Sequence, residues 1–372
     1  MLQSADKISS KKWILCVEGC VQGVGFRPFV YRLAKKYCLA GYVQNTSTGV
    51  YIEVQAEEES LLCFKNELLS SKPEKAVIAD ITIEETEASD AIDFIIKESI
   101  CSEQTTLCLL PDTAMCHLCF EEFSDPSNRR YLYPFIHCMS CGPRFSLFEK
   151  MPFDRIHTTM KDFAMCTECQ QEYTSPESRR FFSQTNCCPS CGPALKLLDK
   201  EQNLIAQGYQ AIEASLEHLK NGKIVAVKNT GGFLLVTDAR SSDSVQTLRD
   251  RKKRGSKPFA LLISNIEKAK HIAYIDKAQE DILTSAAAPI VLLKKKEDIS
   301  LIAPNVCSES PYLGIMLASN ALLHLLCQVD IPLVATSGNI AGHPLCITDE
   351  AAYTELDQCA DFFLTHNRRI RN

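Results

Sequence analysis

The stretch VEGCVQGVGFRPFVYRL, residues 17–33, runs from an apolar, strand-like segment through a glycine-punctuated turn into a segment with helical period. Gly23 and Gly25 can adopt the backbone conformations that a tight turn or a close approach to a ligand requires. A glycine-rich turn that leads into a helix presents N–H groups to an anion, with the positive end of the helix behind them. Arg27 can donate two parallel hydrogen bonds to phosphoryl oxygens. By composition alone, the stretch supports a phosphate-binding cradle and a plain turn about equally.

The residues around this stretch predict a small domain of strands and helices. The apolar run KWILCVEG comes first, and apolar residues then recur at helical spacing over residues 26–37. The turn-rich TSTG between GYVQN and GVYIEVQ indicates a hairpin. A second helix near residues 61–68 and an alternating strand near residues 77–83 follow, with DFII as a last short strand. The order βαββαβ is the ferredoxin-like arrangement.

The composition of the 372 residues is that of a globular protein, since 45% of them are hydrophobic and 23% charged. A formal net charge of −6 argues against a dominant surface for a polyanion. No apolar run approaches the ~18 residues of a membrane span. The five-residue apolar run in KKWILCVEG is shorter than the roughly 7–15 residues that a signal peptide needs. We therefore expect a cytoplasmic protein that does not bind a membrane.

Nineteen cysteines are unusual for a reducing compartment, where clustered cysteines are typically metal ligands. Eight of them form four CxxC pairs, and a shift of 50 residues superimposes the first two pairs on the last two. The two sets are Cys116, Cys119, Cys138 and Cys141, and Cys166, Cys169, Cys188 and Cys191. Each reads C-x2-C-x18-C-x2-C, a spacing typical of four thiolates around one zinc ion. Because four thiolates leave no open coordination position, we predict two structural zinc ions.

Other side chains next to these ligands leave alternatives open. Cys187 is a rival of Cys188 as a ligand, although the register of the repeat favours Cys188. His117 and His137 also adjoin ligands, and we interpret them as surface or supporting histidines rather than as ligands.

The residues after the second cysteine set predict an α/β domain with a largely buried sheet. YQAIEASLEHLKNG is amphipathic with helical period and ends in a glycine, a typical helix stop. The runs KIVAVK, FLLVT, PFALLI, PIVLL and PLVAT are short, apolar and bounded by turn residues, as buried strands separated by helices are.

EGCVQGVGFRPFVYRLA and GYVQNTSTGVYIEVQ resemble the acylphosphatase family, and the likeness covers residues 12–98. It implies that the loop holds an acyl phosphate and that an asparagine on the neighbouring strand orients the attacking water. The implied phosphate-binding loop is Gln22, Gly23, Val24, Gly25, Phe26 and Arg27, and the implied catalytic residues are Arg27 and Asn45. Hydrolysis of a mixed anhydride requires charge neutralisation and a positioned water more than a strong base. We expect residues 1–98 to suffice for this activity.

The order of the regions resembles that of a larger family. An acylphosphatase-like domain, two four-cysteine modules with NRRYLYPFIHCMSCGPRFS and MPFDRIHTTM, and an α/β domain follow one another as in the HypF family of hydrogenase maturation carbamoyltransferases. The last region then resembles YrdC-like domains, whose nucleotide site carries K-x-R and S-x-N. The matching residues are Lys252, Arg254, Ser337 and Asn339. TSGN follows an apolar run, and open α/β sheets bind ligands at the carboxyl ends of their strands.

This second resemblance implies a reaction sequence. Carbamoyl phosphate loses its phosphate in the first domain, and the carbamate reacts with ATP in the YrdC-like domain to give carbamoyl adenylate and pyrophosphate. A further domain passes the carbamoyl group to a cysteine of a HypE-type carrier protein, on the way to the cyanide ligands of nickel–iron hydrogenase. Lys252 and Arg254 would neutralise ATP phosphates, and Ser337 and Asn339 would donate or accept hydrogen bonds with phosphate or carbamate.

Two departures from the family pattern bear on these expectations. The sequence stops at FFLTHNRRIRN, so we interpret it as the N-terminal half of such a protein, either a fragment or a chain whose partner supplies the transfer step. Residues 228–239, KNTGGFLLVTDA, stand where the family reads K-G-x-G-G-[YF]-H-L-x-C-D-A. Asn229, Leu234 and Thr237 replace glycine, histidine and cysteine, and Gly255 stands where proline is usual. These differences concern adenylation rather than hydrolysis.

Two other interpretations stay open beside a carbamoyltransferase. One is an enzyme that retains only acyl-phosphate hydrolysis. The other is a non-catalytic protein whose zinc ribbons and YrdC-like domain bind RNA or a protein partner; the arginine pairs at 129–130 and 179–180 fit RNA, and the acidic net charge disfavours it. The predicted domains of this α+β multidomain chain are an acylphosphatase-like domain (12–98), tandem zinc modules (105–198, with 116–141 and 166–191) and a YrdC-like domain (203–372).

Overall fold

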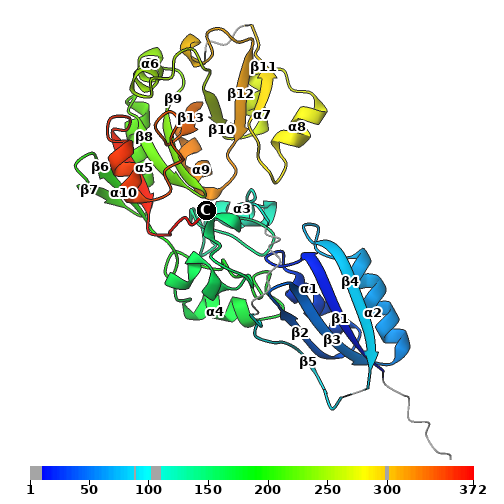
Figure 1. The fold of residues 1–372 in the computed structure, drawn as a ribbon. Helices are drawn as coiled ribbons and strands as arrows, with labels where there is room; N and C mark the ends of the chain where they lie inside the picture. Colours follow the sequence, from blue (N-terminus) through cyan, green and yellow to red (C-terminus); the bar gives the residue numbers. More distant parts are fainter. Residues whose placement is uncertain (1–10, 88, 102–109, 298–300) are drawn as a thin grey trace, which may run out of the picture. The chain divides into compact units, whose positions relative to one another are not determined.

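The structure is a computed structural model that describes residues 11–87, 89–101, 110–297 and 301–372 (Figure 1). Contacts between residues group the chain into two compact units. Unit 1 comprises Met1–Pro111, Cys138–Ser140 and Phe148–Asn186, and unit 2 comprises Asp112–His137, Cys141–Leu147 and Cys187–Asn372. The predicted boundary at residue 105 lies outside the described residues. Within the described ranges, none of the helices combines the length and hydrophobicity that crossing a bilayer requires.

Unit 1 contains a five-stranded sheet in the order β4-β1-β3-β2-β5. Its elements are β1 (Lys11–Cys20), α1 (Phe26–Lys36), β2 (Ala40–Asn45), β3 (Gly49–Ala56), α2 (Glu58–Ser70), β4 (Val77–Thr86) and β5 (Phe94–Ile96). β2 and β5 are parallel, and the other neighbours are antiparallel. This is the predicted ferredoxin-like order, with the short β5 at the edge of the sheet, and the prediction is confirmed.

The core of unit 1 lies between this sheet and its two helices. Leu15 on β1 and Ile52 on β3 are fully buried, and for β3 this is what the alternation of apolar and polar residues predicts. α1 contributes Val30 and α2 contributes Phe64, both with no exposed surface. Burying one such side chain stabilises the fold by roughly 1.5–3 kcal/mol. This packing fixes the start of α1, where the glycine-rich loop ends.

The two cysteine modules repeat in structure as well as in sequence. α3 (His117–Ser124) and α4 (Thr167–Thr174) each begin one residue after a cysteine of their set. Leu132 and Phe182, which are 50 residues apart, both adopt a left-handed φ, of 52° and 54°. Three short 3-10 helices lie between the modules, η1 (Phe145–Leu147), η2 (Arg155–His157) and η3 (Thr159–Asp162).

Unit 2 contains a nine-stranded mixed sheet in the order β11-β12-β10-β13-β9-β8-β14-β6-β7. The strands are β6 (Leu195–Asp199), β7 (Leu204–Gln207), β8 (Val225–Asn229), β9 (Gly232–Asp238), β10 (Ala260–Ile263), β11 (Val291–Lys294), β12 (Tyr312–Leu317), β13 (Leu333–Ser337) and β14 (Phe362–His366). The helices are α5 (Tyr209–Lys220), α6 (Ser242–Arg251), α7 (Ile266–Ile272), α8 (Lys277–Leu283), η4 (Pro304–Val306), α9 (Ala321–Leu326), η5 (Cys327–Val329) and α10 (Asp349–Glu355). β10 pairs parallel to β12, and β8 parallel to β14. The prediction of an α/β domain with a largely buried sheet is confirmed, with one exception: β11, which corresponds to the run PIVLL, lies at the edge of the sheet and has only Leu293 buried.

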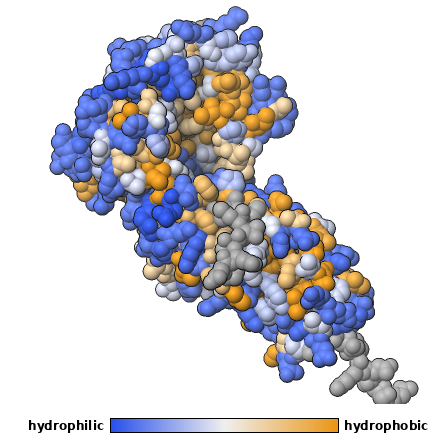
Figure 2. Space-filling model, in the orientation of Figure 1, coloured by the Kyte–Doolittle hydropathy of each residue, from blue (hydrophilic) through white to orange (hydrophobic). Residues whose placement is uncertain are grey.

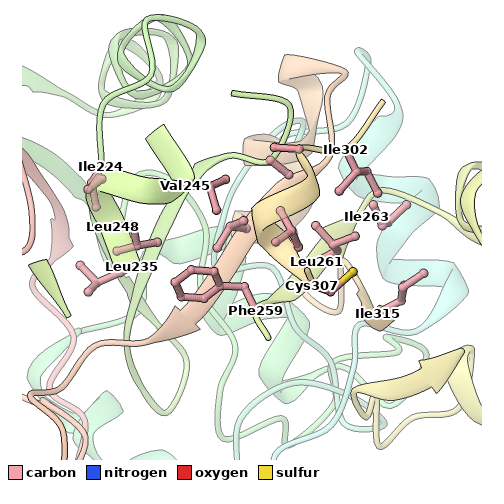
Figure 3. Packing of buried hydrophobic residues seen from close by; sticks show 14 of the residues in the cluster. Ile224, Leu235, Val245, Leu248, Phe259, Leu261, Ile263, Ile302, Cys307 and Ile315 are labelled. Carbon is pink, nitrogen blue, oxygen red and sulfur yellow. The ribbon is translucent and has the colours of Figure 1, made fainter. Parts of the chain in front are cut away.

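The core of unit 2 packs the sheet against α6 and the segments that follow it (Figure 3). Leu235 on β9, Val245 on α6 and Leu261 on β10 have no exposed surface, and Phe259 lies among them in the close view. This packing holds the end of α6 and the start of β10, which flank the predicted K-x-R, at fixed positions.

The surface is apolar at the edge of this sheet that β11 forms. Figure 2 shows hydrophobic residues gathered over β11 and β12. Ile290 and Leu292 are 55% and 70% exposed there. The predicted nucleotide site lies elsewhere in the sheet, at the end of β13.

Candidate functional sites

The loop between β1 and α1 forms an open end of a helix that suits an anion. Gly23 and Gly25 have φ of 73° and 79°, in the left-handed region that favours glycine. No side chain caps the helix, since Gly25 is its N-cap, and the first turn carries no acidic residue. The first N–H groups of this 11-residue helix therefore face outward at its positive end. A phosphate bound there would be held by backbone N–H groups.

Arg27 brings a guanidinium to the same end of α1. Its side chain is 9% exposed, and its Nη2 donates to Oδ1 of Asp154 at 2.6 Å. Nη1 donates to Oγ of Ser99 at 3.3 Å. The ring of Phe182 lies 5.9 Å from the guanidinium carbon. The guanidinium is thus held on several sides, as recognition of a phosphoryl group through two hydrogen bonds requires.

Gln22 braces the loop through its side chain. Its Nε2 donates to the main-chain oxygens of Thr46 and Gly49, at 2.7 and 2.8 Å. Its Oε1 accepts the main-chain N–H of Phe153 at 2.8 Å. Gln22 is 3% exposed, and its amide group bonds to three main-chain groups, so its side chain supports the loop from within.

Asn45 ends β2 and is 1% exposed. Its Oδ1 is buried and has no hydrogen-bond partner within the described part of the chain. A buried amide oxygen without a partner costs about 1–3 kcal/mol, and a water molecule would relieve that cost. The main chain of Asn45 accepts the N–H of Ile100, while Arg27 contacts the preceding Ser99. Residues 99–100 therefore bring Asn45 and Arg27 to one site.

Aromatic rings from the second cysteine module line this site. Phe182 packs on Tyr173 and Phe181, with ring centroids 5.0 Å apart in both pairs. Tyr31 of α1 meets Phe181 edge-on at 5.2 Å. Burial raises the pKa of Tyr173 above its ordinary value. Tyr173 therefore stays neutral at physiological pH and leaves Arg27 as the charged group that can meet a phosphate.

Sequence reasoning missed Asp154, Ser99 and the aromatic residues at this site. Asp154 is 127 residues from Arg27 in the chain, and no periodicity or spacing connects the two. The signal in the sequence was MPFDRIHTTM, which carried the family resemblance but pointed to no partner.

The two cysteine sets converge as the repeat predicts. In each set, the four sulfur atoms all lie within 4.8 Å of one another. The Sγ atoms of Cys119 and Cys141 are 3.6 Å apart, and those of Cys188 and Cys191 are 3.7 Å apart. Tetrahedral zinc with Zn–S bonds of about 2.3 Å places its sulfurs roughly 3.8 Å apart. The two groups fit two structural zinc ions.

The neighbours of the cysteine sets have other partners. Sγ of Cys187 faces the hydroxyl of Tyr133 at 3.7 Å and the carbonyl of Phe135 at 3.5 Å, and Cys187 is in neither set. His117 lies on the surface beside Glu121, in neither set. When bound, zinc would hold each module in shape, and with four thiolates around it no position stays open for a substrate.

One arginine of each pair that could have contacted RNA is buried. Arg130 is 2% exposed, and its Nε donates to the main-chain oxygen of Cys187 at 2.9 Å. Arg180 is 3% exposed. One member of each arginine pair is thus part of the interior of its module, which weakens the case for RNA binding.

Lys252, Arg254, Ser337 and Asn339 come together in unit 2. Nζ of Lys252 donates to the main-chain oxygens of Ser337 and Asn339, at 2.5 and 3.0 Å. The hydroxyl of Ser337 donates to Oδ1 of Asn339 at 2.7 Å. Arg254 donates to Oγ1 of Thr336 at 3.2 Å and stacks 4.6 Å from the ring centroid of Phe259. Since Ser337 is the last residue of β13, the site lies at the carboxyl end of a strand, as predicted for TSGN.

The lysine of this site, Lys252, has an unusually low pKa. It is 9% exposed, and burial lowers the pKa of Lys252 to about 8. Burial also lowers the pKa of Arg254. Two cations that are partly removed from water are suited to a polyanionic ligand, which would restore favourable surroundings for their charges.

The residues that depart from the family pattern have defined surroundings. Oδ1 of Asn229 accepts a hydrogen bond from Nδ2 of Asn320 at 2.8 Å, and Oγ1 of Thr237 donates to the carbonyl of Lys223 at 3.1 Å. Leu234 lies directly opposite Ser337 in the β9–β13 ladder. Thus the replacement of the family histidine by Leu234 falls next to the predicted nucleotide site, whereas Asn229 and Thr237 serve local hydrogen bonds.

Three family models match the chain. The one described as Acylphosphatase matches residues 13–96, and the one described as HypF finger matches residues 115–148 and 165–198. The one described as Telomere recombination, which covers Sua5, YciO and YrdC proteins, matches residues 217–372.

Individual relatives agree with these matches. Carbamoyltransferase HypF of Synechocystis sp. is 44% identical over 355 residues, which are 95% of this chain and 46% of that protein. The acylphosphatase of Thermotoga petrophila is 44% identical over 82 residues, which are 22% of this chain and 90% of that protein. A crystal structure of full-length HypF in the phosphate- and nucleotide-bound form superimposes with a TM-score of 0.93 at 41% identity, covering 98% of this chain and 47% of that one. The chain spans about half the length of these HypF relatives and belongs to the HypF family of carbamoyltransferases.

Proposed function

We propose that this chain performs two successive steps of carbamoyl transfer, the hydrolysis of carbamoyl phosphate in unit 1 and the adenylation of the released carbamate in unit 2. The observation that carries the first step is the meeting of the uncapped start of α1, the Arg27 guanidinium and the unpartnered Oδ1 of Asn45. The second step is supported by the cluster of Lys252 and Arg254 around the end of β13. The names of its HypF relatives and the phosphate and nucleotide bound to one of them agree with both.

In the first step, the phosphoryl group of carbamoyl phosphate lies against the N–H groups of the loop and Arg27. Oδ1 of Asn45 accepts a hydrogen bond from a water molecule and thereby directs the oxygen of that water toward phosphorus. A bond forms between the water oxygen and phosphorus while the bridging P–O bond breaks. The electron pair of that bond leaves on carbamate, and the water's proton passes to a phosphoryl oxygen. Arg27 and the helix start stabilise the negative charge that spreads over the equatorial oxygens.

In the second step, ATP binds with its phosphates toward Lys252 and Arg254. A carbamate oxygen attacks the α-phosphorus, and the bond from that phosphorus to the β-bridging oxygen breaks. The electron pair leaves with pyrophosphate, and carbamoyl adenylate remains. The two cations would stabilise the charge on the leaving group, while Ser337 and Asn339 would orient the carbamate.

The proposal extends to the organisation and partners of the chain. We propose an acylphosphatase-like domain over residues 12–98, tandem zinc modules over 105–198 and a YrdC-like domain over 203–372. The zinc ions are structural and take no part in either step. A HypE-type carrier protein would receive the carbamoyl group in the hydrogenase maturation pathway, and both would be cytoplasmic.

Separate measurements of phosphate and pyrophosphate test the two steps. The zinc-loaded chain is incubated with carbamoyl phosphate, with and without ATP. We expect phosphate release in both cases and pyrophosphate release when both substrates are present. Phosphate without pyrophosphate would select an enzyme that only hydrolyses acyl phosphates. Release of neither, together with salt-dependent RNA binding, would select a non-catalytic RNA-binding protein.

A further inference from the structure

Asp154 is a carboxylate at a phosphate site, where a second negative charge is unfavourable. Its Oδ1 accepts from Nη2 of Arg27 at 2.6 Å, and its side chain is 17% exposed. Any phosphate that binds Arg27 comes close to this carboxylate and is repelled by it. A site that bound only phosphate would bind it better without Asp154, so the presence of this carboxylate points to a second role in ligand recognition.

Asp154 is held firmly in its position from both sides. The preceding Phe153 donates its N–H to Gln22, and the N–H of His157 donates to the main-chain oxygen of Asp154 at 2.8 Å. The following Arg155 donates its main-chain N–H to Oε1 of Gln184 at 2.8 Å. The Arg155 guanidinium also binds three main-chain oxygens, those of Phe163, Gln184 and Asn186, at 2.7–2.9 Å. Because its neighbours in the chain are anchored by these hydrogen bonds, the carboxylate of Asp154 is held in a defined position beside Arg27.

The second oxygen of Asp154 is an acceptor without a donor. Oδ2 has no hydrogen-bond partner among the residues that the structure describes, and the side chain does not cap η2, although Asp154 is its N-cap residue. A carboxylate in this position can accept hydrogen bonds from a ligand that Arg27 holds by its phosphoryl group.

Carbamoyl phosphate carries the matching donor. It differs from acetyl phosphate in having an amide NH2 where acetyl phosphate has a methyl group. The nitrogen is two bonds from the bridging oxygen, at the end of the substrate that leaves from phosphorus. The two substrates present the same phosphoryl group to the loop and to Arg27, so the cradle alone cannot distinguish them.

We propose that Asp154 accepts a hydrogen bond from the amide N–H of carbamoyl phosphate and thereby selects it over acyl phosphates whose acyl group carries no donor. This inference rests on the proposed hydrolysis of carbamoyl phosphate by unit 1. The repulsion between Asp154 and phosphate is then offset by the hydrogen bond for carbamoyl phosphate and is left uncompensated for acetyl phosphate. Because the carboxylate keeps some contact with water, we expect discrimination of about tenfold to a hundredfold, below the limit for a fully enclosed site.

The test compares two substrates on three variants of the full zinc-loaded chain. Phosphate release from carbamoyl phosphate and from acetyl phosphate is measured for Asp154→Ala, for Asp154→Asn and for Asp80→Ala, a control in which an exposed aspartate of β4 is changed. We expect Asp154→Ala to lower the ratio of kcat/KM for carbamoyl over acetyl phosphate about tenfold to a hundredfold. Its kcat/KM for acetyl phosphate should rise, since the repulsion is gone. Asp154→Asn, which keeps an acceptor oxygen, should lie between, and Asp80→Ala should match the unchanged chain.

A second measurement separates selection from mere support of Arg27. If Asp154 selects the substrate, inorganic phosphate should inhibit Asp154→Ala at lower concentrations than it inhibits the unchanged chain. Parallel losses with both substrates, together with weaker inhibition by phosphate, would overturn the inference and make Asp154 a positioning residue for Arg27. In that case the proposed hydrolysis still stands. Failure of the unchanged chain to hydrolyse carbamoyl phosphate would overturn the proposed function, and the inference with it.

Discussion

The main-chain N–H of Phe153 donates to Oε1 of Gln22 at 2.8 Å, so a residue between the two cysteine sets braces the loop that we propose as the phosphate cradle. The adjacent Asp154 pairs with Arg27. Residues 1–98 therefore contain the loop and its arginine but neither of these partners. The expectation that residues 1–98 suffice for hydrolysis of a simple acyl phosphate stays a prediction, and phosphate release by residues 1–98 expressed alone tests it.

The first prediction concerns this brace. Gln22→Leu keeps the size of a buried side chain but leaves the oxygens of Thr46 and Gly49 and the N–H of Phe153 without their partner. Each buried group left unpaired costs about 1–3 kcal/mol. We expect a lower urea midpoint for unit 1 and a marked loss of phosphate release. Gln44→Leu, on the exposed side of the neighbouring β2, serves as the matched control. Equal stability of the two variants would contradict a bracing role.

The second prediction concerns Arg27. Arg27→Ala removes the guanidinium that would meet the phosphoryl group, and we expect kcat for acyl-phosphate hydrolysis to fall by about 10²–10³. Arg27→Lys should recover part of it, because a lysine restores the charge without the two parallel donors. Arg32→Ala removes an arginine from the same helix that binds the carbonyls of Pro176 and Ser178, and it should retain the activity. Activity that survives Arg27→Ala would mean that QGVGFR is only a turn.

The third prediction concerns the metal. Purified chain should contain about two equivalents of zinc, one for each four-sulfur group. Cys119→Ser should lower this to about one, since a buried ligand of the first set is lost. Cys63→Ser, which changes an exposed cysteine on α2, should leave two equivalents. Metal analysis that finds two equivalents in Cys119→Ser, or disulfides in place of free thiols, would refute the assignment.

Features that depend on neighbouring residues or on a repeated spacing could be predicted from the sequence, whereas contacts between distant residues could not. A short apolar run predicted β1, alternation of apolar residues predicted β3, and helical spacing predicted α1, because local geometry alone determines these patterns. The identical spacing of the two cysteine sets predicted which sulfurs meet, since four ligands of one ion must converge. Asp154 could not be found in this way. Its partner is 127 residues away, and only the folded chain brings the two together.

The same limit applies to Lys252. The K-x-R and S-x-N pairs were matched through the family resemblance, but nothing in the sequence indicated that Nζ of Lys252 would bind the main chain of TSGN. Its low pKa follows from burial by residues of several strands and helices, which no local pattern records. The lysine is thus both a candidate contact for ATP and a brace of the loop.

The fourth prediction follows from this pKa. Burial lowers the pKa of Lys252 from 10.5 to about 8, so the folded chain binds fewer protons than the unfolded chain between these values. The free energy of unfolding therefore rises as the pH increases from about 8 to 10.5. Below about pH 8 the lysine is charged in the folded chain, and the full cost of burying that charge opposes folding. ATP affinity should change in the opposite direction and fall as the pH rises from 7 to 9, because the charge that faces the phosphates is lost. Calorimetric titration at both values measures this.

A variant with a permanent charge is the control for that experiment. In Lys252→Arg the guanidinium stays protonated over the whole range, so ATP affinity should change little between pH 7 and pH 9. Lys257→Ala, which removes an exposed lysine nearby, should retain the pH dependence of the unchanged chain. An ATP affinity that falls equally in Lys252→Arg would show that another group titrates.

The last prediction concerns Leu234, where the family pattern has histidine. Leu234 and Ser337 are directly opposite each other on β9 and β13, and side chains of such a pair lie on the same face of a sheet. A histidine at this position would place a hydrogen-bond donor beside Ser337, at the end of the site where carbamate is expected, whereas leucine offers none. We therefore expect slow pyrophosphate release by this chain and a higher rate in Leu234→His. Thr237→Cys, which restores another family residue at a position bonded to the carbonyl of Lys223, should have little effect on the rate. ATP binding measured by calorimetry should be similar in all three proteins, since the change is at the carbamate end. If Leu234→His leaves pyrophosphate release unchanged while ATP still binds, residue 234 does not contribute to the carbamate end of the site.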